Sequence, residues 1–247
     1  MLNDFENKYQ QLLSDTEKFL KQEFEFYGND LYKEEQMRTK KVTEPTSTTR
    51  SEELFQEKWQ NSNSLGELNS QICTCLKCPL GNSRTKFVFG VGNPNADLMF
   101  IGEAPGADED LQGEPFVGRA GQLFNKILEA IQLKREDIYI CNILKCRPPN
   151  NRDPQISEVE QCIPYLWKQI ELVKPKIIMS LGRIAAQMLL NTNESLTKMR
   201  ETKLEYRGVP LLVTFHPAAL LRNPNWKRPA WEDFKKLKSM LEQITSH

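Results

Sequence analysis

Residues 97–106 read Asp-Leu-Met-Phe-Ile-Gly-Glu-Ala-Pro-Gly, a short apolar run that ends in a turn. An apolar run of this length, bounded by turn-forming residues, is typical of a strand that is buried on both faces of a sheet. Similar apolar runs recur at 138–144, 176–181 and 210–215. The four segments together predict a buried parallel sheet.

Helical patterns separate and follow these predicted strands. They cover residues 119–133, 155–173, 182–191 and 229–244. Pro154 and Pro229 stand where two of the helices would begin, a position that proline favours. Alternating strands and helices predict an α/β domain with three layers, α/β/α, around a central parallel sheet.

Polar and turn-forming residues follow the predicted strands. Glu103 and Gly106 follow the first strand, Asn142 lies in the second, Gly182 follows the third and His216 follows the fourth. Ligands of such sheets bind beyond the carboxyl ends of the strands. We therefore expect a functional site where these residues converge.

Length and composition limit the class of protein. The 247 residues suffice for one α/β domain plus an appendage. No run of 18 apolar residues occurs, so no membrane span is expected. The N-terminus resembles neither a signal peptide nor a transit peptide, which indicates a cytoplasmic protein. In that reducing compartment, the six cysteines are more often ligands or buried thiols than disulfides.

A formal net charge of zero conceals an asymmetry along the chain. Residues 1–70 carry 9 Lys and Arg against 14 Asp and Glu, whereas residues 71–247 carry 24 against 19. A mildly basic body suits an anionic partner such as nucleic acid. The excess is small, and many enzymes that never bind nucleic acid are as basic.

The acidic first part of the chain predicts a separate extension. Residues 1–28 show the spacing of an amphipathic helix, and residues 40–49 are polar and rich in helix breakers, as in a linker. We therefore expect a helical, partly flexible extension over 1–70 and the main domain over 71–247. The predicted helix has two interpretations, an arm that is solvated or packed on the body, and a site for a protein partner.

Four of the cysteines have the spacing of metal ligands. Cys75 and Cys78 form a C-x₂-C loop, Cys146 follows the second predicted strand, and Cys162 comes 16 residues later in a helix. Two such pairs suit a zinc ion or an iron–sulfur cluster, and the spacing leaves both open. The C-x₂-C loop also suits a redox dithiol, although no strand precedes it.

The two other cysteines are distinguished by their neighbours. Cys141 alternates with Ile140 and Ile143 in a predicted strand, which favours a small core residue. Cys73 could compete with Cys75 as a ligand.

Three motifs carry a resemblance to a known family. Gly102–Asp110 with Gly113–Gly121 resembles the first active-site motif of family 4 uracil-DNA glycosylases. Asn142–Arg152 resembles the second motif of that family, and His216–Pro224 the third. The similarity runs over residues 72–242 with the motifs in the family's order.

The resemblance implies a fold, an activity and a cofactor. Members of the family flip uracil out of DNA and hydrolyse its N-glycosidic bond, which leaves an abasic site. They carry a [4Fe–4S] cluster, whose ligands correspond to Cys75, Cys78, Cys146 and Cys162, and whose role here would be structural. We therefore expect a monomeric, nucleoid-associated DNA-repair enzyme that acts on uracil in single- and double-stranded DNA.

Two features depart from the family's pattern. Ala219 stands where the third motif usually has an aromatic residue, and compact family members lack an extension like residues 1–70. A related group that links covalently to uracil has a histidine in an inserted loop. This chain has only His216 and His247, so that chemistry is not expected.

The expected uracil pocket uses residues from all three motifs. Phe116 would stack on the flipped base, which is worth about 1–3 kcal/mol. Asn142 has the amide geometry to accept from uracil N3–H and donate to O4. His216 would donate to O2 as negative charge develops on uracil. Backbone amides of the turn that contains Gly102 and Ala104 would assist.

The residue that handles water is harder to assign. Other glycosylase families have an aspartate where Ala104 stands. Glu103 is our first choice for orienting water or stabilising the cationic sugar. Glu109 is the alternative, or excludes the methyl group of thymine. Both acidic residues could instead be solvated surface.

The third motif also predicts how the protein opens the DNA stack. Leu220, Leu221 and Arg222 offer an apolar wedge and a cation of the kind that inserts between bases. The alternative is that both leucines begin a buried helix. Competing hypotheses for the whole chain are a sister iron–sulfur glycosylase with broader base tolerance, a non-catalytic DNA-binding module, and a thiol redox protein.

Overall fold

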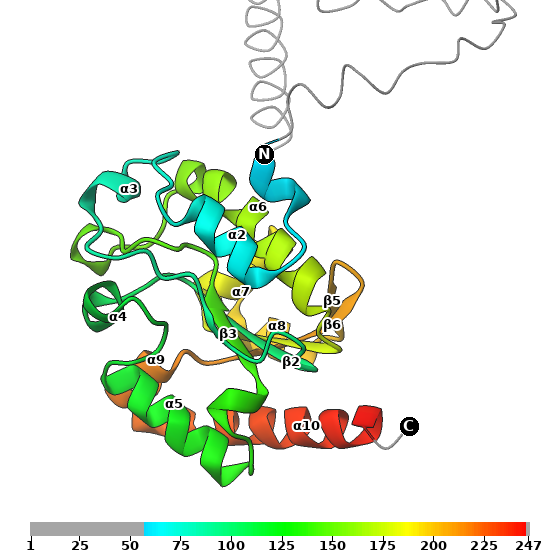
Figure 1. Cartoon of the computed structure of the whole chain (residues 1–247). Helices are drawn as coiled ribbons and strands as arrows, with labels where there is room; N and C mark the ends of the chain where they lie inside the picture. Colours follow the sequence, from blue (N-terminus) through cyan, green and yellow to red (C-terminus); the bar gives the residue numbers. More distant parts are fainter. Residues whose placement is uncertain (1–56, 246–247) are drawn as a thin grey trace, which may run out of the picture. The chain divides into compact units, whose positions relative to one another are not determined.

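A computed structural model of the chain describes residues 57–245 (Figure 1). The helix predicted at 1–28 and the linker predicted at 40–49 therefore lie outside the described residues. Among the described residues, no helix is both long and apolar enough to span a membrane.

The centre of the domain is a six-stranded sheet with the order β1-β3-β2-β4-β6-β5. Its four central strands are parallel, as predicted, and comprise β3 (Tyr139–Asn142), β2 (Leu98–Gly102), β4 (Ile177–Leu181) and β6 (Val209–Thr214). Gly102 pairs with Asn142, and Leu181 pairs with Thr214. The carboxyl ends of these strands thus lie along one edge.

Two short antiparallel strands that the sequence analysis did not predict extend the sheet at its edges. β1 (Val91–Gly92) runs antiparallel to β3, and β5 (Leu204–Tyr206) runs antiparallel to β6. β5 and β6 are joined by Arg207 and Gly208, which both have positive φ, as a tight hairpin turn requires. Strands of two and three residues are too short to show a period in the sequence.

Helices cover both faces of the sheet, which confirms the three-layer α/β/α fold (Figure 1). α5 (Arg119–Ala130) and α10 (Lys227–Thr245) pack on the face that carries Phe100. α6 (Ile156–Val173) and α7 (Arg183–Leu190) pack on the opposite face. The shorter helices are α2 (Leu65–Ile72), α3 (Leu80–Ser83), α4 (Ala107–Gln112), α8 (Leu196–Glu201) and α9 (Pro217–Arg222).

Residues 57–72, most of which fall at the end of the predicted extension, pack on the domain. Trp59 is buried, and its ring meets Tyr165 of α6 edge-on at 4.8 Å between centroids. Leu68 and Ile72 of α2 are fully buried in the same cluster. Trp59 and Tyr165 are far apart in the sequence, which is why composition alone does not reveal the packing.

Candidate active site

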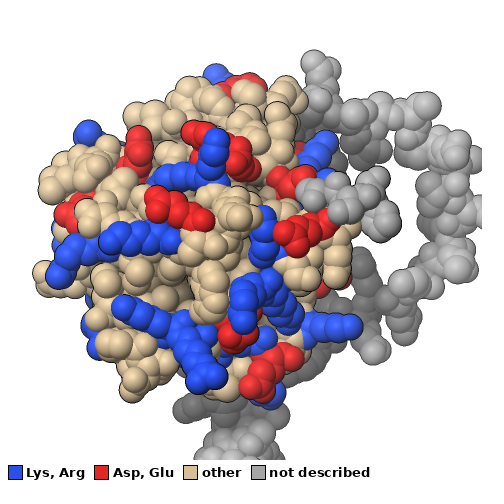
Figure 2. Space-filling view, turned by 90° about the horizontal axis from the view of Figure 1, so that it is seen from below, with Lys and Arg blue, Asp and Glu red and all other residues tan. Residues whose placement is uncertain are grey.

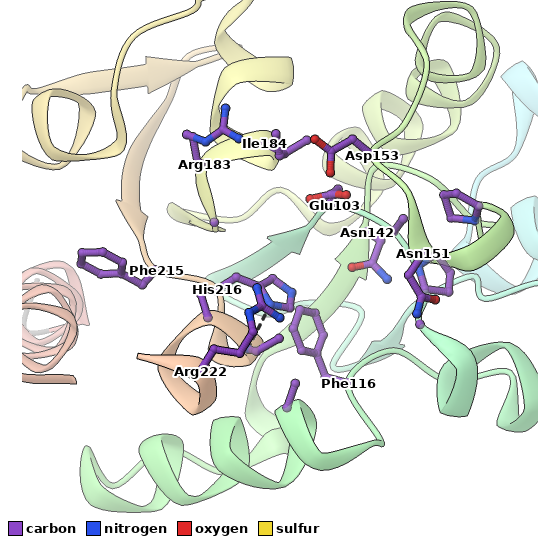
Figure 3. A pocket seen from close by; sticks show the side chains of 18 of the residues that line it. Glu103, Phe116, Asn142, Asn151, Asp153, Arg183, Ile184, Phe215, His216 and Arg222 are labelled. Atoms are coloured by element: carbon purple, nitrogen blue, oxygen red, sulfur yellow. Dashed lines mark hydrogen bonds between the residues drawn. The ribbon is translucent and has the colours of Figure 1, made fainter. Parts of the chain in front are cut away.

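A cavity of about 740 Å³ opens beyond the carboxyl ends of the central strands (Figure 3). Six of the predicted site residues line it, namely Glu103, Ala104, Glu109, Phe116, Asn142 and His216. Arg222 also lines it, whereas Leu220 and Leu221 do not. The parallel register therefore brings the three sequence motifs together at one site.

Asn142, the last residue of β3, presents an unsatisfied acceptor to the cavity. Its side chain is buried, and Oδ1 has no hydrogen-bond partner within residues 57–245. A buried acceptor without a partner costs about 1–3 kcal/mol. The arrangement suits a ligand that donates a hydrogen bond to this oxygen.

Gly102 has no side chain because Asn142 and Phe116 occupy the space. A Cβ at this position would lie 2.3 Å from Asn142 Oδ1 and 2.8 Å from Phe116 Cζ. Any side chain would displace both residues. Gly102 itself does not line the cavity, and its predicted role in binding is reduced to leaving room for Asn142 and Phe116.

Lys145 lies behind Asn142 and is fully buried. Its Nζ donates to the backbone carbonyl of Asn142 at 2.7 Å and to Gln169 Oε1 at 2.5 Å. Gln169 in turn donates to the Phe89 carbonyl and to the Tyr139 hydroxyl. This network fixes the backbone of Asn142 through its carbonyl group. It was not predicted from the sequence.

Phe116 is held in the cavity by its backbone. It has a left-handed φ of 55°, and its carbonyl accepts from Arg135 Nη1 at 3.2 Å, while Arg135 Nη2 donates to the Pro115 carbonyl. Gly121 is required because a Cβ there would lie 1.8 Å from the Phe116 carbonyl oxygen. The Phe116 ring lies 5.5 Å from that of His216.

Glu109 fastens two loops of the cavity to each other. Its Oε1 accepts from the backbone N–H groups of Val117 and Gly118 at 2.9 and 3.0 Å. Its Oε2 accepts from Gly106 at 3.1 Å. Because both oxygens are occupied, Glu109 is the weaker of the two candidates for handling water.

His216 follows β6 and caps the N-terminus of α9. Its Nδ1 accepts from the Ala218 backbone N–H at 3.1 Å. The neutral ring must therefore carry its proton on Nε2. Burial, and then the nearby charge of Arg222, lower the pKa of His216 to about 4. At neutral pH the side chain is an uncharged hydrogen-bond donor.

Glu103 and Asp153 line the cavity with carboxylate oxygens that have no hydrogen-bond partner among residues 57–245. Glu103 is half-buried, and its backbone carbonyl accepts from Leu144 N–H at 3.0 Å, which leaves the carboxylate directed to the cavity. Burial raises the pKa of Glu103 to about 7, the charge of Asp153 raises it further, and Arg183 opposes the shift. Both neighbours also line the cavity beside Glu103 (Figure 3). The carboxyl group is thus poised to exchange protons near neutral pH.

Of the three residues predicted to insert between DNA bases, one is buried in the core. Leu220 is 2% exposed and packs with Phe215 and Ala230, so it belongs to the core. Leu221 is 45% exposed, and Arg222 is also exposed. Successive residues of α9 point in different directions, so only Leu221 and Arg222 are available to contact a partner.

The four predicted ligand cysteines gather in one hydrophobic cluster, in which Cys146 and Cys162 are buried and Cys75 and Cys78 pack against them. Among residues 57–245, no three His, Cys, Asp or Glu side chains are placed to hold a metal ion. Cys141 is a buried core residue, which confirms the prediction made for it. The Sγ of Cys73 lies near the Ser70 carbonyl.

Hydrogen-bond donors surround three of these sulfurs. Arg84 Nη1 lies 3.3 Å from Cys146 Sγ. The backbone N–H of Lys145 lies 3.3 Å from Cys162 Sγ, and the Tyr165 hydroxyl lies 3.2 Å from Cys75 Sγ. Such donors stabilise thiolate ligands, whether these hold a zinc ion or an iron–sulfur cluster.

Comparison with known proteins identifies the family. The sequence profile of the uracil DNA glycosylase superfamily matches residues 89–235. The type-4 uracil-DNA glycosylase of Archaeoglobus fulgidus is 47% identical over 182 residues, which cover 70% of this chain and 92% of that protein. This chain belongs to the type-4 uracil-DNA glycosylases.

Two further relatives support this placement. The type-4 uracil-DNA glycosylase of Sulfurisphaera tokodaii is 42% identical over 186 residues, 72% of this chain and 84% of that protein. The type-5 uracil-DNA glycosylase of Pyrobaculum aerophilum is 30% identical over 147 residues, 52% of this chain and 64% of that protein. In identity and in coverage, this type-5 glycosylase is less similar to the chain than the two type-4 glycosylases.

Within this type-4 glycosylase, sequence reasoning missed three residues of the site. Asp153 and Trp226 line the cavity, and Lys145 supports Asn142. Lys145 directly follows the apolar residues Ile143 and Leu144, and this pattern could have indicated a buried lysine. Asp153 and Trp226 reach the cavity only through the path of their loops, which no sequence period reveals.

Proposed function

We propose that this chain removes uracil from DNA, leaving free uracil and an abasic site. The observation that carries the proposal is the buried, unpaired Oδ1 of Asn142, which faces a cavity shared with Phe116 and His216. Membership of the type-4 family supports the same activity.

Uracil fits this cavity through complementary groups. Asn142 Oδ1 accepts from N3–H and its amide donates to O4, while Phe116 stacks on the ring. His216 Nε2–H donates to O2. Ala104 and the turn that Glu109 fastens lie where they can exclude the methyl group of thymine. Flipping the nucleotide costs a few kcal/mol, and Leu221 and Arg222 would fill the gap that it leaves.

The reaction breaks the C1′–N1 bond, and the electron pair of that bond moves onto uracil. His216 stabilises the developing charge at O2 without transferring its proton. Glu103 as carboxylate stabilises the cationic sugar and accepts a proton from the water whose oxygen bonds to C1′. The uracil anion then takes up a proton.

The pH dependence of excision tests the role of Glu103. Its pKa of about 7 means that the carboxylate form is lost as pH falls below 7. We expect the single-turnover rate to rise about tenfold per pH unit well below 7 and to level off above 8. His216, with a pKa of about 4, stays neutral over this range.

Glu103→Gln should abolish this rising limb as well as slow the reaction. The measurement is single-turnover uracil release between pH 5.5 and 8.5 for both proteins. A wild-type rate that does not change with pH, or a Gln variant with an unchanged limb, would contradict the assignment.

We propose that Cys75, Cys78, Cys146 and Cys162 hold a [4Fe–4S] cluster. The donors to three of the sulfurs suit thiolate ligands, and membership of the type-4 family favours the cluster over zinc. When bound, the cluster would tie the loop before α3 to α6, a structural role.

Protein purified without oxygen should contain four irons per chain and absorb visible light. Alanine at any of the four positions should remove both signals. Cys141→Ala, a buried cysteine outside the set, is the matched control and should keep them. Stoichiometric zinc without iron would refute the proposal.

We propose that residues 1–70 form an extension of the glycosylase domain over 71–247. Deleting residues 1–56 should leave uracil excision unchanged, because the three site motifs and the match to the superfamily profile lie after them. Deleting residues 1–65 also removes buried Trp59 and should lower the free energy of unfolding by about 3 kcal/mol. Chemical denaturation and excision assays on both truncated proteins test these expectations. If the protein without residues 1–56 folds but does not excise uracil, the extension is part of the catalytic unit.

A base-release assay tests the proposed activity against its rivals. Oligonucleotides that carry uracil, hypoxanthine or thymine, single- and double-stranded, are incubated with the protein and their abasic sites are cleaved. We expect cleavage at uracil alone. Release of hypoxanthine would favour the sister family, and binding without release would favour a DNA-binding module. A DNA-repair enzyme should also colocalise with the nucleoid, which a fluorescent fusion would show.

A further inference from the structure

The mouth of the cavity carries a large aromatic side chain that the reaction above does not use. Trp226 ends the 3₁₀ turn η5 (Pro224–Trp226), immediately before α10. It lines the cavity, and 41% of its surface is exposed. An exposed indole at the entrance of a binding site suits contact with a partner.

The indole is held in place by an aromatic stack. Trp226 lies nearly parallel to Phe215, with centroids 5.3 Å apart and 26° between the rings. Phe215 is buried and directly precedes His216. The guanidinium of Arg200 packs over the Phe215 ring at 4.7 Å, and Asp233 binds Arg200 with two hydrogen bonds of 2.7 and 2.9 Å.

Cations flank this indole on both sides in the sequence. Arg222, Lys227 and Arg228 are exposed, and none of them forms an ion pair with any residue between 57 and 245. Figure 2, the view from below, shows many Lys and Arg side chains over the face that α5 and α10 form, with Asp and Glu among them. The cations next to Trp226 are thus available to bind an anionic ligand.

We propose that Trp226 is a platform on which a DNA base next to the flipped uracil stacks, while Lys227 and Arg228 bind the adjoining phosphates. This inference rests on the proposed function. An aromatic ring between cations is the arrangement by which proteins hold single strands, since every base has a face to stack. With the flipped nucleotide in the cavity, the nucleotide on one side of it would pass Trp226, which lines the same cavity.

The platform should matter most for single-stranded DNA. In a duplex, the complementary strand keeps the flanking bases stacked, whereas a single strand has only the protein to order them. We therefore expect Trp226→Ala to raise the KM for a single-stranded uracil substrate roughly tenfold. The single-turnover rate at saturation should change far less, and Trp226→Phe should restore most of the affinity.

Trp231→Ala is the matched control. Trp231 lies on α10, is 37% exposed and does not line the cavity, so the same truncation is made outside the proposed platform. It should bind single-stranded DNA as the wild type does. A loss equal to that of Trp226→Ala would overturn the proposal.

Substrates that lack one base locate the contact directly. A baseless spacer replaces the first or second nucleotide on either side of uracil, which keeps the phosphate and removes the ring. In the wild type, one of these positions should weaken binding about as much as Trp226→Ala does. In the variant, that position should no longer matter.

The outcomes separate this proposal from the activity itself. If the wild type excises uracil and Trp226→Ala responds to every spacer as the wild type does, the platform is refuted and the activity stands. If the cluster-loaded wild type releases no uracil, the proposed function fails first.

Discussion

Replacing His216 with alanine should slow uracil excision by about 100- to 1,000-fold, the usual cost of removing one donor from a site where negative charge develops. The neutral ring offers Nε2–H to the cavity because Nδ1 accepts from Ala218. A donor that is already uncharged and fixed in place needs no reorganisation during the reaction. The loss should therefore appear in the single-turnover rate at saturating DNA.

The same substitution also removes the cap of α9, which costs about 0.5–2 kcal/mol of stability. His216→Asn separates the two effects, because asparagine is a good helix cap whose amide is too short to replace Nε2. We expect His216→Asn to melt close to the wild-type temperature and still lose at least about 100-fold in rate. A His216→Asn protein with the wild-type rate would remove His216 from the reaction.

Asn142→Asp should reduce uracil excision at least about tenfold, which corresponds to 1.4 kcal/mol or more. An ionised carboxylate only accepts, so it repels uracil O4 where the amide donates. Burial favours the protonated carboxyl, which regains a donor. The loss should consequently grow as pH rises, in contrast to the effect of pH on the wild type.

Cytosine provides the internal comparison for this variant. It presents an N4–H₂ donor where uracil has O4, so the carboxylate matches it better than it matches uracil. Slow cytosine release is expected from Asn142→Asp, limited by the poorer leaving group. If the folded, cluster-loaded variant excised uracil at the wild-type rate, Asn142 would not read this edge of the base.

The sequence predicted the four central strands because each is a short apolar run buried on both faces. Since parallel strands end at one edge, it also predicted that Glu103, Asn142 and His216 would meet, as they do in the cavity. The two edge strands escaped prediction because they hold two and three residues. Local pattern is informative where an element is long enough to show one.

Long-range contacts explain the other differences. Leu220 and Leu221 are equivalent in the sequence, and only the packing of α9 against Phe215 buries the first and exposes the second. From the sequence, Glu109 was a candidate for orienting the attacking water. In the structure, its two carboxylate oxygens accept hydrogen bonds from three backbone N–H groups. Such roles depend on where loops return, which neither composition nor periodicity specifies.

The proposed function requires Asn142 Oδ1 to accept a hydrogen bond from the N3–H of uracil in this cavity. The most direct measurement is base release by the wild type, under single-turnover conditions, from two single-stranded oligonucleotides that differ only at N3 of the target base. One carries uracil, and the other carries 3-methyluracil, which has no donor at this position. We expect uracil to be released and 3-methyluracil to be retained; release of both bases at similar rates would show that Asn142 does not accept from N3–H.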